Sequence, residues 1–286
     1  MKQRTGTAAL IARGGYLWTR FVAHDEGPHS QAAHDSAARE RFLCQAADMV
    51  VGTTPDMVED LSWRYGLDPL HTAVIPNYVL VDEMPRGAAG RTPGLLLYAG
   101  QLVARKRVDV LVQALALITP EVREAIRFEI IGDGPERAAL ERLAASLKVP
   151  VVFRSRVPHH DLLARMRECE LYIQASELEG HPKTVLEAMA SGAAVVVADA
   201  PGLGDAVTHG VTGLRVTPDA RSFAHAIEEL LNDQEWRDMM GSAAAQATRS
   251  SLGLDTILPM EVAVHRRALE QARRRAAMGE GEARVA

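Results

Sequence analysis

The sequence predicts an α/β fold in which parallel strands are covered on both faces by helices, and three observations lead to this prediction. From residue 95 onward, short apolar runs alternate with longer amphipathic segments. The amphipathic segments repeat their apolar residues every three or four positions, as helices with one buried face do. Glycine turns follow the apolar runs near residues 100 and 132, where a strand would give way to a helix.

The N-terminal part, residues 1–86, carries fewer signals of this kind. Apolar runs at 8–12, 49–51 and 72–75 predict three strands, and the spacing of apolar residues over 31–47 predicts one long helix. Three strands make a thin sheet. We therefore expect a partial domain whose open sheet edge favours self-association.

A glycine- and proline-rich stretch, RGAAGRTPG at 86–94, has the composition of a linker. We assign the linker to 87–94 and a second domain to 95–245. The strands predicted in this domain are 95–98, 127–131, 151–153, 171–173 and 194–198. The helices predicted in it are 108–117, 136–147, 161–167 and 184–190. Residues 246–286 form a C-terminal helical segment, with an arginine-rich helix at 257–277.

The composition is 47% hydrophobic and 24% charged, which is ordinary for a globular protein and excludes wholesale disorder. Because the formal net charge is −5, we expect no nucleic-acid partner. The apolar run at 8–12 is too short for a signal peptide or a membrane span. Cys44 and Cys169 lack a CxxC spacing or a nearby histidine, as packing cysteines of a reducing compartment do. We expect a cytoplasmic protein, with a peripheral membrane association left open.

The most informative stretch reads SELEGHPKTVLEAMASG at 176–192. It follows the strand predicted at 171–173, and open α/β sheets bind ligands beyond the carboxyl ends of their strands. Gly180 and Pro182 break the chain before a helix that we expect to begin near Lys183 or Thr184. The exposed amides and the positive dipole end of that helix start suit a diphosphate.

Two glutamates flank this helix start, Glu179 on the loop and Glu187 inside the helix. An acidic residue within the apolar sequence VLEAMA is costly to bury without a partner, and ligand hydroxyl groups can provide one. The two glutamates could instead be solvated surface charges or a glycosidase carboxylate pair. A helix start beside the basic residues at 105–107 suits phosphate better than either alternative. The neighbouring His181 invites a metal site, yet the segment offers no third ligand, so we expect no metal.

A cationic turn follows the first strand of the second domain. The sequence AGQLVARKR at 99–107 places a turn at Gly100 and then the basic residues Arg105, Lys106 and Arg107. Cations at the carboxyl end of a strand can neutralise phosphate. A solvated surface turn is the alternative.

These stretches resemble the motifs of glycosyltransferase family 4, whose retaining enzymes have the GT-B fold of two facing Rossmann-like domains. Glu179 and Glu187 match the E-x7-E motif of that family, in the form EGHP followed by EAMA. The resemblance extends over about residues 95–231. It implies a complete C-terminal Rossmann-like donor domain, preceded by an incomplete N-terminal Rossmann-like domain on the acceptor side.

The resemblance implies transfer of a hexose from a nucleotide diphospho-sugar to an acceptor hydroxyl, with retention and without a metal or another cofactor. Lys106 would stabilise the leaving diphosphate, Glu179 would bind the sugar hydroxyl groups and Glu187 the ribose. The leaving phosphate, and no protein base, would help deprotonate the acceptor. The further donor-binding residues that the resemblance implies are Gly100, Gln101, Arg105, Val157, His181, Pro182, Lys183 and Thr184.

Several positions depart from the family pattern. Gln101 replaces an arginine and removes a bidentate cation, for which Arg105 is our candidate replacement. Ser155 replaces a glycine near the nucleobase position, so the base is not predicted. Asp205 matches an acidic loop residue, with loop capping as an equal alternative. The turn GDGPE at 132–136 is expected to be mainly structural, and His159 with His160 to be a solvated helix cap.

The N-terminal part is shorter than the acceptor domain of the resembled family, and Arg13 stands where a histidine is common there. Either the chain is truncated or a partner chain completes the sheet. The acceptor is not predicted, and we expect a glycan, a lipid or a small molecule. Two alternatives to a transferase remain: a nucleotide-sugar-binding protein without turnover, and a sugar phosphorylase or epimerase on the same fold.

Overall fold

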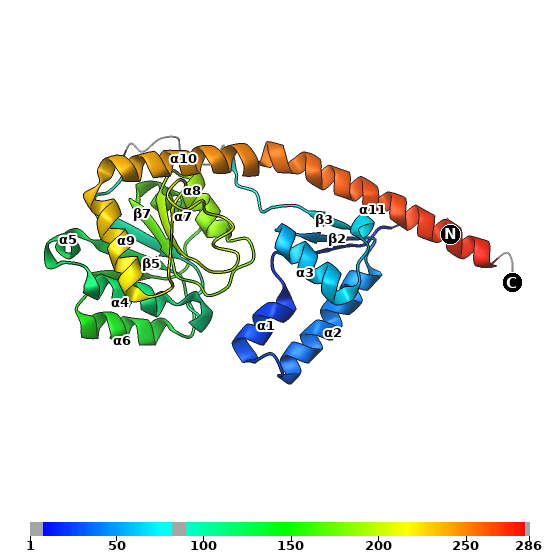
Figure 1. Ribbon diagram of the computed structural model, residues 1–286, viewed down its shortest axis with the longest axis horizontal. Helices are drawn as coiled ribbons and strands as arrows, with labels where there is room; N and C mark the ends of the chain where they lie inside the picture. The colour runs from blue at the N-terminus through cyan, green and yellow to red at the C-terminus, as the bar shows by residue number, and fades with distance from the viewer. Residues whose placement is uncertain (1–7, 82–89, 284–286) are drawn as a thin grey trace. The chain divides into compact units, whose positions relative to one another are not determined.

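The computed structural model describes residues 8–81 and 90–283 (Figure 1). Its contacts divide the chain into two compact units. Unit 1 combines Met1–Asn77 with Asp255–Ala286, and unit 2 is Tyr78–Leu254. The predicted linker at 87–94 falls within unit 2, where residues 87–89 lie outside the described part. Its last residues are bonded into that unit, because Thr92 N donates to Glu168 O at 2.8 Å and Arg127 N to Gly94 O at 2.9 Å.

Unit 2 is built on a six-stranded parallel sheet in the order β6-β5-β4-β7-β8-β9. The five strands predicted for this domain are all present. They are β4 (Leu95–Ala99), β5 (Arg127–Ile131), β6 (Val151–Arg154), β7 (Leu171–Gln174) and β8 (Ala194–Ala198). A sixth strand, β9 (Leu214–Val216), was not predicted; it has three residues, of which only Leu214 is buried.

Helices cover both faces of this sheet, as Figure 1 shows. One layer packs α4 (Val108–Leu117) against α6 (Arg137–Leu147) and α9 (Ala220–Asn232). The other packs α8 (Lys183–Ala190) against α7 (His159–Glu168) and α10 (Gln234–Leu252). A short helix, α5 (Pro120–Ala125), precedes β5. Because both faces are covered, β4 and β8 are buried along their whole length and read as continuous apolar runs in the sequence.

The strand order places a topological switch point between β4 and β7. The chain adds β5 and β6 on one side of β4, and then returns to add β7, β8 and β9 on the other side. At such a point the loops that leave two neighbouring strands diverge to opposite faces, and the space between them is where open α/β sheets bind ligands. The loops after β4 and β7 carry the predicted cationic turn and the first predicted glutamate.

Unit 1 holds a smaller parallel sheet in the order β1-β2-β3. Its strands β1 (Ile11–Arg13), β2 (Met49–Gly52) and β3 (Thr72–Val74) and its helix α2 (Gln31–Ala46) confirm the predicted elements. Two further helices were not predicted, α1 (Trp18–Glu26), which packs against α2, and α3 (Pro55–Tyr65). The boundaries of α3 follow local rules, since Thr54 caps its first turn, Pro55 opens it, and Gly66 ends it with φ of 64°.

The C-terminal segment is helical, as predicted, but it is shared between the units. Helix α10 reaches Leu252 within unit 2, and α11 (Leu254–Ala283) then supplies the C-terminal part of unit 1. Within unit 1, Arg275 Nη1 lies 3.0 Å from Asp48 Oδ1, and Arg13 forms an ion pair with Glu261. The donor domain was predicted to end at residue 245, whereas unit 2 ends at Leu254.

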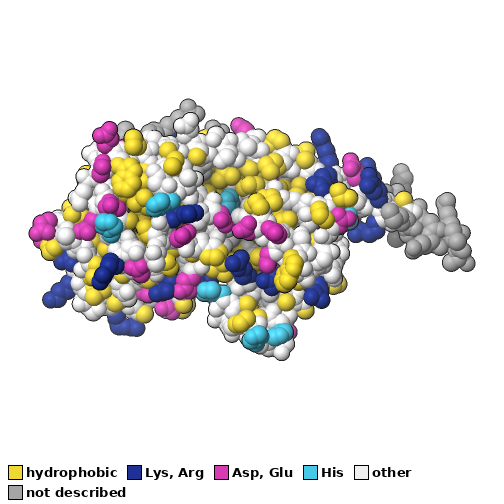
Figure 2. All heavy atoms as spheres, viewed as in Figure 1, with side chains coloured by type: hydrophobic (Ala, Val, Ile, Leu, Met, Phe, Trp, Pro, Cys, Tyr) yellow, Lys and Arg dark blue, Asp and Glu magenta, His cyan; other side chains and the backbone are white. Residues whose placement is uncertain are grey.

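Both cysteines lie in hydrophobic cores, Cys169 in unit 2 and Cys44 in unit 1. Burial raises the pKa of Cys169 to about 12 and that of Cys44 to about 11. None of the helices in the described part of the chain has the length and apolar character needed to cross a membrane. On the face shown in Figure 2, basic and acidic side chains are interspersed and form no single basic patch.

Candidate functional site

Two loops meet at the carboxyl ends of β4 and β7. The backbone amide of Glu177 donates to the carbonyl of Arg105 at 2.9 Å. The side chains reinforce this junction, because Arg107 Nη1 donates to Glu177 Oε1 at 2.6 Å. The predicted cationic turn and the predicted glutamate loop are thus joined directly at the switch point.

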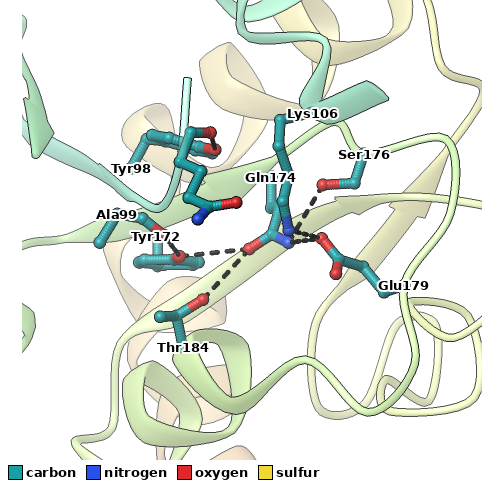
Figure 3. Close-up of polar contacts among 9 residues, drawn as sticks. Tyr98, Ala99, Lys106, Tyr172, Gln174, Ser176, Glu179 and Thr184 are labelled. Atoms are coloured by element: carbon teal, nitrogen blue, oxygen red, sulfur yellow. Dashed lines mark hydrogen bonds and ion pairs between the residues drawn. The ribbon is translucent and has the colours of Figure 1, made fainter. Parts of the chain in front are cut away.

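Lys106 and Glu179 face one another across this junction and form an ion pair through Nζ and Oε1 (Figure 3). Their side chains are only 14% and 9% exposed. Lys106 ends a short 3-10 helix (Ala104–Lys106), and Arg107 follows it with a left-handed φ of 46°. The structure therefore brings the two residues predicted to be catalytic into contact with each other.

A third residue, Gln174, completes this cluster and was not predicted from the sequence. Its amide Nε2 donates to Glu179 Oε1 at 2.7 Å and to Ser176 Oγ at 3.2 Å. Its Oε1 accepts from Tyr172 Oη at 3.2 Å and from Thr184 Oγ1 at 3.4 Å. Gln174 is the last residue of β7 and is only 2% exposed, so the cluster is rooted in the sheet (Figure 3).

Tyr172 supports the same cluster from the strand. Burial raises the pKa of its hydroxyl well above the usual value, so the group keeps its proton and can donate. Its oxygen also lies 3.1 Å from the carbonyl oxygen of Ala99, the last residue of β4. The hydroxyl thus lies within reach of acceptors at the ends of both strands that flank the switch point.

The start of α8 lies beside this cluster, as predicted. The helix begins at Lys183, and Pro182 precedes it without any side-chain cap. The amides of Val185 and Leu186 both donate to Pro182 O, at 3.0 and 3.1 Å. The earlier amides of the first turn have no carbonyl within the helix to bond, which leaves them for an anion. The exposed Lys183 lies with Nζ 5.6 Å from the centre of the Tyr78 ring.

Glu187 is buried on α8, with its side chain 3% exposed, and it has partners within the protein. Its Oε1 lies 2.9 Å from His159 Nε2 and 3.7 Å from Lys183 Nζ. His159 does lie at a helix start with its side chain 45% exposed, as expected, but its contact with Glu187 was not predicted. His159 opens α7, and the packing of α7 against α8 brings its ring to a carboxylate 28 residues away. His160 does fit the expectation, with its side chain 82% exposed.

A pocket of about 230 Å³ opens at the carboxyl ends of β4, β5 and β6. It brings together four of the predicted donor-binding residues, Gly100, Gln101, Val157 and Thr184. Asp133 and Arg156 also line it. Lys106, Glu179 and Glu187 are not among its lining residues, and Thr184 links the pocket to their cluster through Gln174.

Glycines at 132 and 134 let two loops of this pocket approach closely, which explains the predicted GDGPE turn. A Cβ atom at Gly132 would lie 1.8 Å from the carbonyl oxygen of Gly100, and one at Gly134 would lie 2.2 Å from that of Leu102. The backbones bond directly, with Leu102 N to Asp133 O at 3.0 Å. The structural interpretation of this turn holds, and the turn shapes the pocket wall.

The loop 199–205 packs against the backbone of Glu179. Glu179 N donates to Pro201 O at 3.0 Å. Gly202 has a left-handed φ of +81°, and a Cβ atom there would lie 2.3 Å from the carbonyl oxygen of Glu179. The loop thus holds Glu179 from the backbone while Lys106 and Gln174 hold its carboxylate.

His181 is half-buried next to this loop. Burial lowers the pKa of its ring to about 4, and the charge of Asp205 opposes that shift. The ring is therefore neutral at neutral pH. Within residues 8–81 and 90–283, no cluster of three or more His, Cys, Asp or Glu side chains is arranged to hold a metal ion.

Comparisons with known proteins identify the family of this chain. A family model described as "Glycosyl transferases group 1" matches residues 82–247, more than half of the chain. A D-inositol 3-phosphate glycosyltransferase of Geodermatophilus obscurus is 31% identical over 254 residues, which cover 81% of this chain and 55% of that protein. Its counterpart in Streptomyces scabiei is 29% identical over 276 residues, covering 88% and 60%. The chain thus spans less than two thirds of these relatives.

Solved structures share the fold. Anabaena Alr3699/HepE in complex with UDP and glucose matches with a TM-score of 0.76 and 20% identity, over 89% of this chain and 70% of that one. Sucrose-phosphate synthase from Thermosynechococcus elongatus matches with a TM-score of 0.76 and 22% identity, over 90% and 67%. These similarities confirm the predicted α/β fold of the GT-B type.

Proposed function

Because the chain belongs to the glycosyl transferases group 1 family, we propose that it transfers a hexose from a nucleotide diphospho-sugar to an acceptor hydroxyl. We also propose that it is a family 4 member that retains the anomeric configuration. The observation that carries the proposal is the partly buried pair of Lys106 and Glu179 at the switch point, beside the start of α8. The lysine cation and the amides at the helix start suit the phosphate oxygens of the diphosphate. The carboxylate suits the sugar hydroxyl groups.

Lys106 serves the leaving group in this scheme. An ammonium has three donors, so Lys106 can keep its bond to Glu179 and still donate to the diphosphate. Negative charge grows on the diphosphate as the bond to the sugar breaks, and a fixed cation with the first amides of α8 stabilises that charge. The leaving phosphate takes part in deprotonating the acceptor, and we assign no protein base.

The two glutamates bind different parts of the donor. Glu179 accepts hydrogen bonds from the sugar hydroxyl groups, with its carboxylate held by Lys106 and Gln174. Glu187 accepts from the ribose, with its carboxylate beside His159. The pocket of about 230 Å³, which Val157 lines, binds the nucleobase. His181, Pro182 and Lys183 complete the wall around the sugar and the diphosphate.

Gln101 stands where the family pattern has an arginine, so the site has one cation fewer than that pattern. Gln101 is exposed at the pocket, and its amide cannot replace a bidentate guanidinium. Arg105 stays our candidate replacement, on the same loop and half-buried. We therefore expect weaker diphosphate binding than a site with both cations would give.

Donor and acceptor identity are tested most directly with the full chain. Relatives of this fold were solved with UDP, with UDP and glucose, and with UDP-glucose, so UDP-sugars are the first donors to assay, followed by GDP-sugars. The curated relatives are named for D-inositol 3-phosphate, which makes inositol phosphates the first acceptors to include. Sugar transfer or donor hydrolysis supports the proposal, and NMR of the product anomer tests retention.

Variants and controls separate the alternatives. Lys106→Ala is expected to lower turnover by about 100-fold or more, the scale seen when one group that stabilises transition-state charge is lost. Arg142→Ala, on the exposed face of α6, is the matched control and should leave turnover unchanged. Donor binding without transfer or hydrolysis would instead favour a binding protein. Release of sugar phosphate that depends on added phosphate would favour a phosphorylase.

A further inference from the structure

Gln174 is a buried polar residue in a strand that otherwise belongs to the hydrophobic core. The three residues before it, Leu171–Ile173, are 0% exposed, and Gln174 itself is 2% exposed. A buried amide is unfavourable unless its donors and acceptor are bonded. Here both the NH₂ group and the carbonyl oxygen of the amide have hydrogen-bond partners, at distances of 2.7 to 3.4 Å. A residue of this kind fixes the geometry of its partners.

From this geometry we infer that Gln174 is the positioning residue that holds the Glu179 carboxylate, and with it the start of α8, in the arrangement that the donor sugar requires. The inference rests on the proposed function and extends it to a residue that touches no donor atom.

The chemistry of the partners fixes which way the amide points. An ionised carboxylate only accepts hydrogen bonds, so the atom of Gln174 that faces Glu179 must be the NH₂ group. Its carbonyl oxygen then faces two hydroxyl groups, those of Tyr172 and Thr184, and both can donate. The reversed amide would oppose its carbonyl oxygen to the carboxylate. The orientation is therefore determined by the network.

Gln174 and Lys106 hold the same oxygen of Glu179. Both donors approach Oε1, so the carboxylate cannot rotate without breaking an ion pair and a hydrogen bond (Figure 3). This arrangement presents Oε2 to the sugar hydroxyl groups. The same Gln174 amide accepts from Thr184 in the first turn of α8. Gln174 therefore connects the carboxylate that binds the sugar to the helix start that binds the diphosphate.

Two variants test this role. Gln174→Met keeps the length of the side chain but removes every hydrogen bond, and we expect kcat/KM for the donor to fall by about 10- to 100-fold, the effect of losing a hydrogen bond to a charged group. Gln174→Glu places a second carboxylate against Glu179. We expect it to be inactive at pH 8 and to recover towards pH 5, where one shared proton restores the donor. Gln113→Met, on the exposed side of α4, is the control for the substitution itself.

Amide hydrogen exchange of residues 176–181 in the full chain, without ligand, gives a readout that needs no activity. The inference expects faster exchange of this loop in Gln174→Met than in the wild type, with Gln113→Met unchanged. If the wild type neither binds nor turns over any nucleotide-sugar, the proposed function fails, and the exchange data still decide whether Gln174 holds the loop. Wild-type kcat/KM in Gln174→Met, or a pH profile of Gln174→Glu parallel to that of the wild type, overturns the inference. So does an unchanged exchange rate.

Discussion

The ring nitrogen Nε2 of His159 lies 2.9 Å from Oε1 of Glu187, which joins the first residue of α7 to a buried carboxylate of α8. Because the ionised carboxylate only accepts, the histidine donates this bond. The bond limits the rotation of the group that we assign to the ribose.

We expect His159→Ala to raise the KM for the donor by about 10-fold with a smaller change in kcat, because one charge-assisted hydrogen bond that orients Glu187 is lost. His159→Gln, which keeps a donor, should restore part of the affinity. His160→Ala is the matched control, since His160 is next in the chain and 82% exposed. Steady-state kinetics against donor concentration measures the effect. Equal KM values for the two alanine variants would contradict the assigned role.

Gly202 is expected to be required for the position of Glu179. Gly202→Ala introduces a Cβ atom 2.3 Å from the carbonyl oxygen of Glu179, so the loop must shift. Gly210→Ala is the control, because Gly210 has a similar left-handed φ of +75° but no atom within 4 Å of the new Cβ. Both variants carry the cost of the left-handed backbone, about 1 kcal/mol or more. Only Gly202→Ala should also weaken donor binding, as measured by titration calorimetry.

His181 should make the protein less stable in mild acid. Its pKa is about 4 in the folded state and 6.5 ordinarily, so between these values the unfolded chain binds more protons than the folded one. The contribution of His181 to the free energy of unfolding is complete above pH 6.5 and is lost as the pH falls towards 4. Between pH 7 and pH 5 this amounts to about 2 kcal/mol.

His181→Gln should therefore lose less stability than the wild type over this pH range. Urea unfolding of the full chain at pH 7, 6 and 5 measures the difference. The same pH dependence in both proteins would show that His181 is not the group responsible.

A buried carboxylate on β5 is expected to stabilise unit 2. Glu129 is 0% exposed, with Arg127 Nη2 at 2.6 Å and Arg154 Nε at 3.1 Å. Both arginines reach solvent. Glu129→Ala should therefore lower the free energy of unfolding by roughly 2 kcal/mol, between the effects of breaking an exposed and a fully buried ion pair. Glu141→Ala removes an exposed pair with Arg137 on α6 and should cost less than about 0.5 kcal/mol. Unfolding midpoints of the two variants provide the comparison.

Much of unit 2 could be predicted because its signals are local. Each strand there is a short apolar run bounded by turns, and the spacing between Glu179 and Glu187 is visible in the sequence itself. The placement of Lys106 and Glu179 in loops that follow strands also comes from a local rule. Sequence periodicity does not give the strand order that makes those strands neighbours.

The contacts that were missed depend on tertiary packing. His159 reaches Glu187 only because α7 packs against α8, and no local pattern announces that contact. Gln174 did leave a signal, a polar residue at the end of an apolar strand directly before the glutamate loop. In unit 1 the helix α3 left signals too, with Thr54, Pro55 and Gly66 at its boundaries. Its apolar face is short, and the exposed Trp63 obscures the amphipathic pattern.

The ion pair of Lys106 and Glu179 gives each of these two charges a partner within the protein. In the proposed scheme a free nucleotide diphosphate would share Lys106 with Glu179 and would provide no hydrogen-bond donor for that carboxylate. In the proposed scheme an intact sugar nucleotide would satisfy both members of the pair, with phosphate oxygens for the lysine and hydroxyl groups for the glutamate. The site should thus discriminate substrate from spent product and release the product readily. A Kd for the nucleotide diphosphate below that of the sugar nucleotide, by calorimetry on the full chain, would refute this expectation.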